Sequence, residues 1–314
     1  MFDIEEIISV IKDRQATSAG LQFPEGLKRK GPEIAKEIEK RTGITVIISG
    51  DPCYGACDID EDLLEMVDVM FHFGHSRLLD DDRVVYIEYY HEVDVNNAVE
   101  AALPLLGHKV GVVTTVQHIH MMDRIIELLK KAGKEPVIQK GDTRIAYPGQ
   151  VLGCNFTSAP KDVDTILFIG TGNFHPMGIR LSAKVPVVAA DPFTGEARIV
   201  DVEKIMRQRY AVIAKAMDAK KWGIIIGMKS GQKRLELAQQ LKGLAEDAVL
   251  ISIREISADR LLSFKVDAYV STVCPRVAID DAGRFPVPVL TPVEFEILKG
   301  LRKWEDLVFD EIKD

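Results

Sequence analysis

The feature that most constrains this chain is an internal repeat, because the same series of strand-like runs occurs three times from one end to the other. In every copy a Val-Asp pair introduces one of these runs. The pairs are Val67-Asp68, Val163-Asp164 and Val266-Asp267. Their spacing of about 100 residues is far longer than a solenoid period and matches the size of a whole domain. The sequence therefore predicts triplication of a domain rather than a continuous superhelix.

Each copy contains four short apolar runs in one order, and the first run is followed by an amphipathic helical pattern. Short apolar strands that alternate with helices indicate parallel sheets with right-handed crossovers. We therefore predict an α/β fold of three pseudo-symmetric domains, each a small, mostly parallel four-stranded sheet flanked by helices. The predicted strands, with the loop that follows the first strand of each copy, lie at residues 20–26, 45–49, 69–75 and 84–87, then 112–118, 136–139, 165–170 and 185–190, then 224–232, 249–253, 268–272 and 285–290. The predicted helices after the first strands lie at 33–41, 120–132 and 234–245, and the predicted domains span 1–100, 101–208 and 209–314.

Composition excludes several classes of function. The 314 residues are 46% hydrophobic, which is ample for several cores. A formal net charge of −8 argues against a nucleic-acid partner, because no basic field gathers phosphates. The amino-terminal segment is acidic and amphipathic rather than a signal peptide, and no apolar run approaches the roughly 20 residues of a membrane span. We expect a soluble, cytoplasmic protein with no membrane association, in which cysteines serve as metal ligands, reactive thiols or core residues rather than in disulfides.

Three cysteines are distributed one to each copy, at Cys57, Cys154 and Cys274. Each lies where a predicted strand gives way to a loop, and in parallel sheets ligands bind beyond the carboxyl ends of the strands. If the copies face one another around a pseudo-threefold axis, the sulfurs meet at its centre. Three thiolates without a fourth protein ligand suit a [4Fe–4S] cluster that keeps one iron open to substrate. The alternative is three ordinary buried cysteines, but these residues occupy Gly- and Pro-containing loops rather than apolar faces.

The fourth cysteine, Cys53, forms a C-x3-C pair with Cys57. The C-x3-C-x2-C loop of ordinary radical S-adenosylmethionine enzymes would need a cysteine at position 60, which is Asp60. A closed, structural four-cysteine zinc site is a further alternative, but such sites usually draw their ligands in local pairs, and Cys154 and Cys274 are solitary. We therefore expect Cys53 to lie outside the ligand set. His72 has no ligand spacing either and is predicted to be structural or exposed.

Polar loop residues near the predicted strand ends are candidates for binding a substrate or cofactor. They are Gln22, Pro24, His75, Gln117, Gln232, Lys233 and Arg276. Gly170 and Gly172 precede a predicted helix, whose first amides could hold an anion. This G-x-G is weak by itself, since neither G-x-G-x-x-G nor a Walker loop is present. The alternatives are a backbone-bonded loop histidine for His75 and a surface ion pair with Asp280 or Asp281 for Arg276.

Six segments spread along nearly the whole chain carry a family resemblance. They lie at residues 22–27, 54–57, 73–76, 153–155, 168–170 and 274–276. Together they resemble the archaeal-type diphthamide-biosynthesis enzymes, which are 3-amino-3-carboxypropyl transferases of the non-standard radical S-adenosylmethionine type. The resemblance implies a three-domain fold with one cluster cysteine in each domain, and those positions match Cys57, Cys154 and Cys274.

The resemblance also implies the reaction. The [4Fe–4S] cluster and an electron donor would break the bond between the sulfonium of S-adenosylmethionine and the methionine γ-carbon. The resulting 3-amino-3-carboxypropyl radical would add to the imidazole of one histidine of translation elongation factor 2, the first step of diphthamide biosynthesis. Rim groups such as Gln232, Lys233 and Arg276 would hold the amino acid moiety, and the enzyme would work as a homodimer.

Two other functions remain open on the sequence. A quinolinate synthase–like iron–sulfur dehydratase also combines three pseudo-symmetric domains with three cysteines, but it would condense small acids without S-adenosylmethionine. A non-catalytic small-molecule binding protein would tolerate replacement of the cysteines. The six segments favour the transferase.

Overall fold

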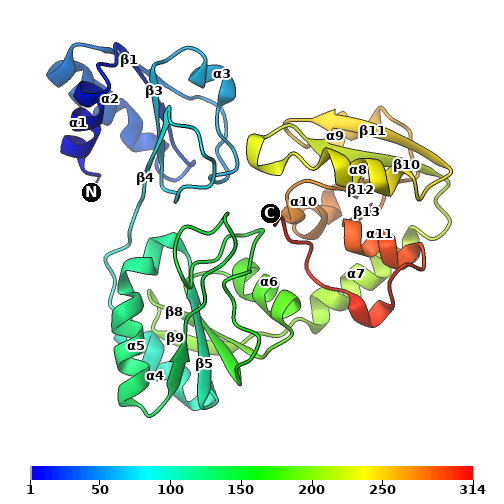
Figure 1. Ribbon diagram of the computed structural model, residues 1–314. Helices are drawn as coiled ribbons and strands as arrows, with labels where there is room; N and C mark the ends of the chain where they lie inside the picture. Colours follow the sequence, from blue (N-terminus) through cyan, green and yellow to red (C-terminus); the bar gives the residue numbers. More distant parts are fainter. Residues whose placement is uncertain (1, 314) are drawn as a thin grey trace.

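The computed structural model describes residues 2–313, which form three α/β units around a common centre (Figure 1). Each unit has its own sheet, and the strand order is equivalent in all three, with the second strand in sequence at one edge and the first strand beside it. The predicted α/β class and the threefold repetition are therefore confirmed.

The first unit has a four-stranded, fully parallel sheet in the order β2-β1-β3-β4. Its elements are α1 (Ile4–Asp13), β1 (Ser18–Gln22), the 3₁₀ helix η1 (Lys28–Lys30), α2 (Gly31–Thr42), β2 (Thr45–Ile48), α3 (Glu61–Leu64), β3 (Val69–Phe73) and β4 (Val84–Ile87).

The second unit has five strands in the order β6-β5-β7-β8-β9, one more than we predicted. Its elements are α4 (Asn96–Ala102), η2 (Leu103–Leu105), β5 (Lys109–Thr114), η3 (Val116–Met121), α5 (Met122–Lys131), β6 (Glu135–Val137), β7 (Thr165–Ile169), α6 (Phe174–Ala183), β8 (Val187–Asp191) and β9 (Glu196–Ile199). The extra strand β9 pairs antiparallel with β8 after a tight turn at Gly195, whose φ is +72°. Because β9 is an edge strand with little buried surface, it has no apolar run by which the sequence could reveal it.

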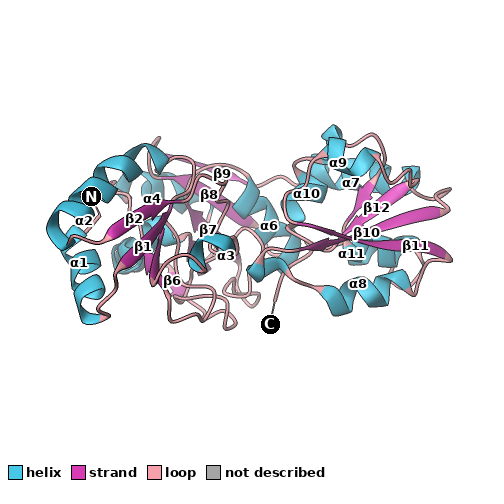
Figure 2. Ribbon diagram, turned by 90° about the horizontal axis from the view of Figure 1, so that it is seen from above, coloured by secondary structure: helices cyan, strands magenta, loops and turns pink. Residues whose placement is uncertain are grey.

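The third unit has a parallel four-stranded sheet in the order β11-β10-β12-β13. Its elements are α7 (Glu203–Lys215), β10 (Lys221–Gly227), η4 (Ser230–Gln232), α8 (Leu235–Lys242), β11 (Asp247–Ile253), α9 (Ala258–Leu262), β12 (Ala268–Ser271), α10 (Pro275–Ile279), η5 (Ala282–Arg284), β13 (Val289–Leu290), α11 (Pro292–Leu298) and η6 (Trp304–Asp306). Helices α8 and α9 cover opposite faces of this sheet (Figure 2). Successive β10 residues accordingly alternate between two cores, with Ile224 in one and Ile225 in the other.

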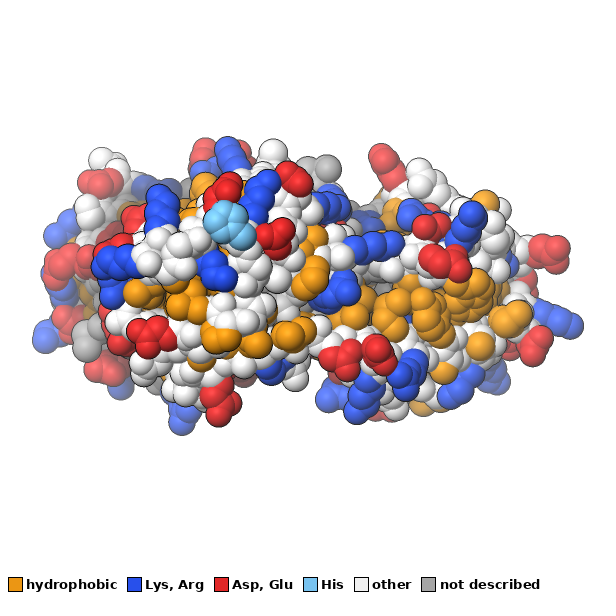
Figure 3. Space-filling view, turned by 90° about the horizontal axis from the view of Figure 1, so that it is seen from below, with side chains coloured by type: hydrophobic (Ala, Val, Ile, Leu, Met, Phe, Trp, Pro, Cys, Tyr) orange, Lys and Arg blue, Asp and Glu red, His pale blue; other side chains and the backbone are white. Residues whose placement is uncertain are grey.

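The surface is mixed in charge. Over the face shown in Figure 3, acidic and basic side chains are interspersed and apolar side chains are exposed between them. The net negative charge is therefore not concentrated on this face. Within residues 2–313, no helix combines the length and the apolar character that crossing a bilayer requires.

The repeated Val-Asp pairs have one structural role in all three units. The aspartate carboxylate accepts hydrogen bonds from two consecutive backbone N–H groups at the start of the first strand of its unit. The N···O distances are 2.7 and 3.0 Å for Asp68 with Thr17 and Ser18, 2.9 and 2.8 Å for Asp164 with His108 and Lys109, and 3.0 and 2.8 Å for Asp267 with Lys220 and Lys221. These bonds fix the first strand beside the third.

The same hydrogen bonds give a testable dependence on pH. Bonds from backbone N–H groups, with that of Lys109 first, lower the pKa of Asp164 in the folded protein. The stabilisation is therefore present above the unfolded pKa of about 3.9 and is lost as the pH falls through the lower folded value. We expect Asp164→Asn to lower the urea midpoint at pH 7, and the difference from wild type to shrink as the pH falls below about 3.9. The exposed Asp218→Asn is the control, and an unchanged midpoint at pH 7 for Asp164→Asn would contradict the anchoring role.

Candidate functional site

Cys57, Cys154 and Cys274 line one cavity of about 240 Å³ where the three units meet. Cys57 lies in the loop between β2 and α3, and Cys154 lies in the long connection between β6 and β7. Cys274 follows β12 and directly precedes α10. Because each parallel sheet directs the carboxyl ends of its strands toward the centre, residues more than 200 positions apart in the chain share this cavity.

An N–H group lies near each of the three sulfurs. Gln232 Nε2 donates a hydrogen bond to Cys57 Sγ at 3.3 Å. The Arg144 side chain beside Cys154 and the backbone N–H of Arg276 beside Cys274 lower the pKa of those two thiols, against the larger effect of burial. N–H groups directed at sulfur favour the thiolate over the thiol and tune the potential of a bound cluster. This donor set therefore fits a centre held by three thiolates.

The raised pKa values of the three cysteines are also consistent with a site for a bound cation. Burial raises the pKa of Cys57 and Cys154, and it raises that of Cys274 to about 11. Neighbouring thiols add to the effect, because the charge of one thiolate disfavours the next. Metal ions supply the positive charge that three adjacent thiolates require.

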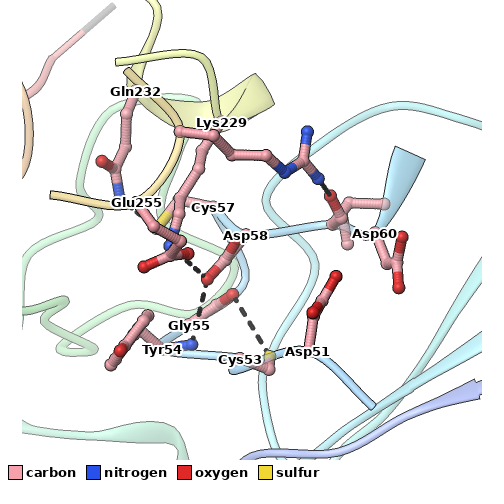
Figure 4. A network of polar contacts seen from close by, with 12 residues as sticks. Asp51, Cys53, Tyr54, Gly55, Cys57, Asp58, Asp60, Lys229, Gln232 and Glu255 are labelled. Carbon is pink, nitrogen blue, oxygen red and sulfur yellow. Dashed lines mark hydrogen bonds and ion pairs between the residues drawn. The ribbon is translucent and has the colours of Figure 1, made fainter. Parts of the chain in front are cut away.

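A buried ion-pair network holds the loop that carries Cys57 (Figure 4). Lys229 Nζ lies 2.7 Å from carboxylate oxygens of both Asp58 and Glu255, and 4.5 Å from the centre of the Tyr54 ring. Burial disfavours the charge of Lys229, but hydrogen bonds to the two carboxylates outweigh it and raise the lysine pKa. The backbone N–H of Gly231 also donates to the Cys57 carbonyl at 3.1 Å. The third unit thus fixes the position of a loop of the first unit.

Several predicted binding residues share the cavity with the cysteines. His75, Gln117 and Arg276 line it, and Gln232 reaches Cys57 as described. The guanidinium of Arg276 lies 4.7 Å from the centre of the Phe174 ring and pairs with Asp280 at 2.7 Å. The surface ion pair considered from the sequence is therefore present, and it coexists with a place in the cavity wall.

Other predicted residues lie outside this lining. Gln22 is buried beneath it, where its Nε2 donates to the Asp58 carbonyl at 2.7 Å. Lys233 points to the surface and pairs with Glu61 at 3.3 Å. Gly170 and Gly172 line a separate cavity of about 230 Å³.

A second, larger cavity adjoins the cysteine cavity. It has a volume of about 550 Å³, includes Pro24, and shares His75, Gln117 and His175 with the first. Burial lowers the pKa of His75 and His175 to about 4, so that both imidazoles are neutral at physiological pH. Together the two cavities form an elongated site with neutral polar groups between them.

Arg144 and Asp58 are site residues that the sequence did not reveal. Arg144 lies in the long connection before Cys154 and donates to the Gly231 carbonyl at 2.9 Å. Its Nε is buried and has no hydrogen-bond partner among the described residues. In the sequence, Arg144 is an isolated arginine in a polar loop, and this pattern is the same as that of an ordinary solvated loop. Asp58 follows Cys57 directly, but its buried cationic partner lies 171 positions away.

Sequence comparisons agree with this architecture. Residues 23–308 match the family model described as "Putative diphthamide synthesis protein". A curated relative from Pyrococcus horikoshii, named 2-(3-amino-3-carboxypropyl)histidine synthase, is 41% identical over 98% of this chain and 92% of its own length. A human relative, named subunit 1 of the same synthase, is 30% identical over 97% of this chain and 73% of its own length.

Structural comparison gives the same result for the fold. The protein is similar to the crystal structure of Dph2 from Pyrococcus horikoshii with a 4Fe-4S cluster, with a TM-score of 0.94 and 39% identity. The match covers 100% of this chain and 94% of that chain. The resemblance read from the six sequence segments is thereby confirmed, and the chain belongs to the diphthamide synthesis protein family.

Proposed function

We propose that this protein is a 2-(3-amino-3-carboxypropyl)histidine synthase. It transfers the 3-amino-3-carboxypropyl group of S-adenosylmethionine to the imidazole of a histidine of translation elongation factor 2, in the first step of diphthamide biosynthesis. The activity named for the relatives from Pyrococcus horikoshii and human supports this proposal. The observation that carries the proposal is the shared cavity of three cysteines from three units, in which Cys57 Sγ accepts a hydrogen bond from Gln232.

In this proposal Cys57, Cys154 and Cys274 hold three irons of a [4Fe–4S] cluster. When bound, the cluster supplies the electron, delivered by an external donor, that cleaves the bond from the sulfonium to the methionine γ-carbon and releases the 3-amino-3-carboxypropyl radical. The chain orients the sulfonium and excludes water from the cavity. The absence of a fourth cysteine from the lining leaves a position for the co-substrate.

The cavity wall provides groups for the amino acid moiety of S-adenosylmethionine. Arg276 offers a cation for the carboxylate, with its guanidinium already oriented by Phe174. Gln117, from the second unit, offers a neutral hydrogen-bonding side chain in the same lining. Gln232 is engaged with Cys57 and positions the sulfur. Lys233, Gly170 and Gly172 contribute nothing to this lining, so the proposed contacts do not include them.

The adjoining cavity provides a route for the acceptor. A protein histidine must approach from outside, and the larger cavity leads to the cysteine cavity past His75 and His175. We place the reaction in the cytoplasm, with elongation factor 2 as the protein substrate and a homodimer as the working assembly.

The decisive experiment follows both products of the transfer. Anaerobically reconstituted, dithionite-reduced protein is incubated with elongation factor 2 and S-adenosylmethionine that carries label in its methionine carboxyl group. We expect methylthioadenosine in solution and label on the elongation factor. Formation of 5′-deoxyadenosine without labelled protein would contradict the transferase. Condensation of small acids without S-adenosylmethionine would favour the quinolinate synthase–like alternative.

A second prediction concerns Arg276. Arg276→Gln removes the cation but keeps the backbone N–H beside Cys274. We expect the KM for S-adenosylmethionine to rise about 10–100-fold, the cost of a lost hydrogen bond to a charged group, with unchanged iron content. Arg284→Gln, at a side chain that is 80% exposed, is the matched control. An unchanged KM in the Arg276→Gln variant would show that Arg276 does not bind S-adenosylmethionine.

A further inference from the structure

A second group of metal-ligating side chains lies beside the cavity of the three cysteines. In the part of the chain that the structure describes, Cys53, His72 and His75 each offer one ligand atom, and these atoms lie within 4.8 Å of one another. Cys53 and His72 are buried, and His75 is half-buried at the cavity wall. None of the three belongs to the trio of cluster cysteines, so their grouping needs its own explanation.

Backbone groups fix the orientation of the Gln22 amide that contacts this group. Gln22 Nε2 lies 2.7 Å from the Asp58 carbonyl, which can only accept, and Gln22 Oε1 lies 3.4 Å from the backbone N–H of Asp60, which can only donate. The amide oxygen therefore faces His72, whose Nδ1 lies 2.8 Å away. Since this oxygen can only accept, His72 Nδ1 carries the proton and Nε2 carries the lone pair.

The lone pair of His72 is directed at His75, and the Cys53 sulfur lies within 4.8 Å of both imidazoles' ligand atoms. His72 Nε2 lies 2.9 Å from His75 Nδ1. Two imidazole nitrogens bound to one zinc at about 2.0–2.1 Å would lie about 3.3 Å apart in a tetrahedral site, so a shift of a few tenths of an ångström suffices. The Cys53 thiol has a weak partner in the described structure, the Gly55 carbonyl at 3.9 Å (Figure 4). The Cys53 sulfur is thus available as the third protein ligand.

We propose that Cys53, His72 and His75 bind one divalent cation of the zinc type, at a site beside the cavity of the three cluster cysteines, whose wall His75 also forms. A thiolate with two imidazoles is a donor set that suits zinc. Metal-bound histidines usually donate their second ring N–H to an oxygen acceptor, as His72 does to Gln22. The fourth position belongs to solvent or to an added ligand.

The site would tie two segments of the first unit together. Cys53 lies four positions before Cys57 in the loop after β2, whereas His72 lies in β3 and His75 lies two residues after that strand. A cation shared by both segments cross-links the Cys57 loop to the end of β3. The C-x3-C pair then serves two centres, with one cysteine in each.

Cobalt titration tests the site in isolation from the cluster. In the full-length Cys57→Ala/Cys154→Ala/Cys274→Ala variant, Cys53 is the remaining cysteine of the four. With Co²⁺ alone as the probe, we expect one bound equivalent with tetrahedral ligand-field bands and thiolate-to-cobalt charge-transfer absorption. Addition of Cys53→Ala removes both signals. Addition of Gln22→Leu weakens binding about 10–100-fold, as loss of an outer-shell partner does. His120→Gln, at an exposed histidine, leaves binding unchanged.

Either of two results overturns the proposal: no stoichiometric Co²⁺ binding, or equal binding in the Cys53→Ala variant. If circular dichroism shows that the triple variant does not fold, zinc and iron are measured in the cluster-loaded protein. We then expect one zinc per chain in wild type, and loss of zinc with retention of iron in Cys53→Ala. Equal zinc in both proteins overturns the site. These metal contents do not depend on turnover, so an inactive protein that binds zinc contradicts only the transferase proposal.

Discussion

Replacement of Cys154 by alanine is expected to abolish the iron–sulfur centre and the transferase activity with it. Cys154 is the cysteine that the second unit contributes to the shared cavity, and no other cysteine lies in that unit. Two thiolates leave two irons without protein ligands, so we expect a larger loss than the roughly 10–100-fold that removal of an outer-shell partner costs a metal site. Iron and sulfide analysis after anaerobic purification, with a visible spectrum before and after dithionite, measures the loss.

Cys53→Ala is the matched control for that experiment. It also removes a buried cysteine, but Cys53 does not line the cavity of the three sulfurs. We expect it to retain the iron and sulfide content of wild type. Full cluster content in the Cys154→Ala protein would end the three-cysteine proposal, whatever the behaviour of Cys53.

Replacement of Lys229 by methionine is expected to cause the largest loss of stability at the site. The side chains of Lys229 and Asp58 are only 6% and 4% exposed, and the pair joins the third unit to the first. Removal of the cation leaves a buried carboxylate without its partner, which costs about 3–5 kcal/mol. The midpoint of the urea transition measures this loss, and Lys229→Met/Asp58→Asn should recover part of it because the buried charge is gone.

Lys233→Met is the control for Lys229→Met, because Lys233 also pairs with an acidic residue of the first unit. Its side chain is 49% exposed and its partner Glu61 is 39% exposed, so Lys233→Met should cost less than about 1 kcal/mol. Equal effects of the two lysine substitutions would show that burial of the Lys229–Asp58 pair does not determine its contribution.

The hydrophobic pattern was sufficient to predict most of the fold. Strands such as Val69–Phe73 and Thr165–Ile169 are buried along their whole length, so they appear in the sequence as continuous apolar runs. The exposed edge strand Glu196–Ile199 has no such run and escaped prediction. A buried strand can be recognised in the sequence by its apolar run, whereas an exposed strand at the edge of a sheet has no such run.

The features of the site can be separated in the same way into those that the sequence predicts and those that it does not. The sequence by itself determined that Cys57, Cys154 and Cys274 lie one in each of three repeated units, in loops that follow strands, because local periodicity marks where each strand stops. Only the tertiary structure decided which side chains accompany them: Arg144 at Cys154, Gln232 at Cys57, and Lys229 beside Asp58. These partners come together through the packing of one unit against another. Such contacts join positions far apart in the chain, so no periodic pattern in the sequence reveals them. The end of a strand, in contrast, can be predicted from the residues next to it.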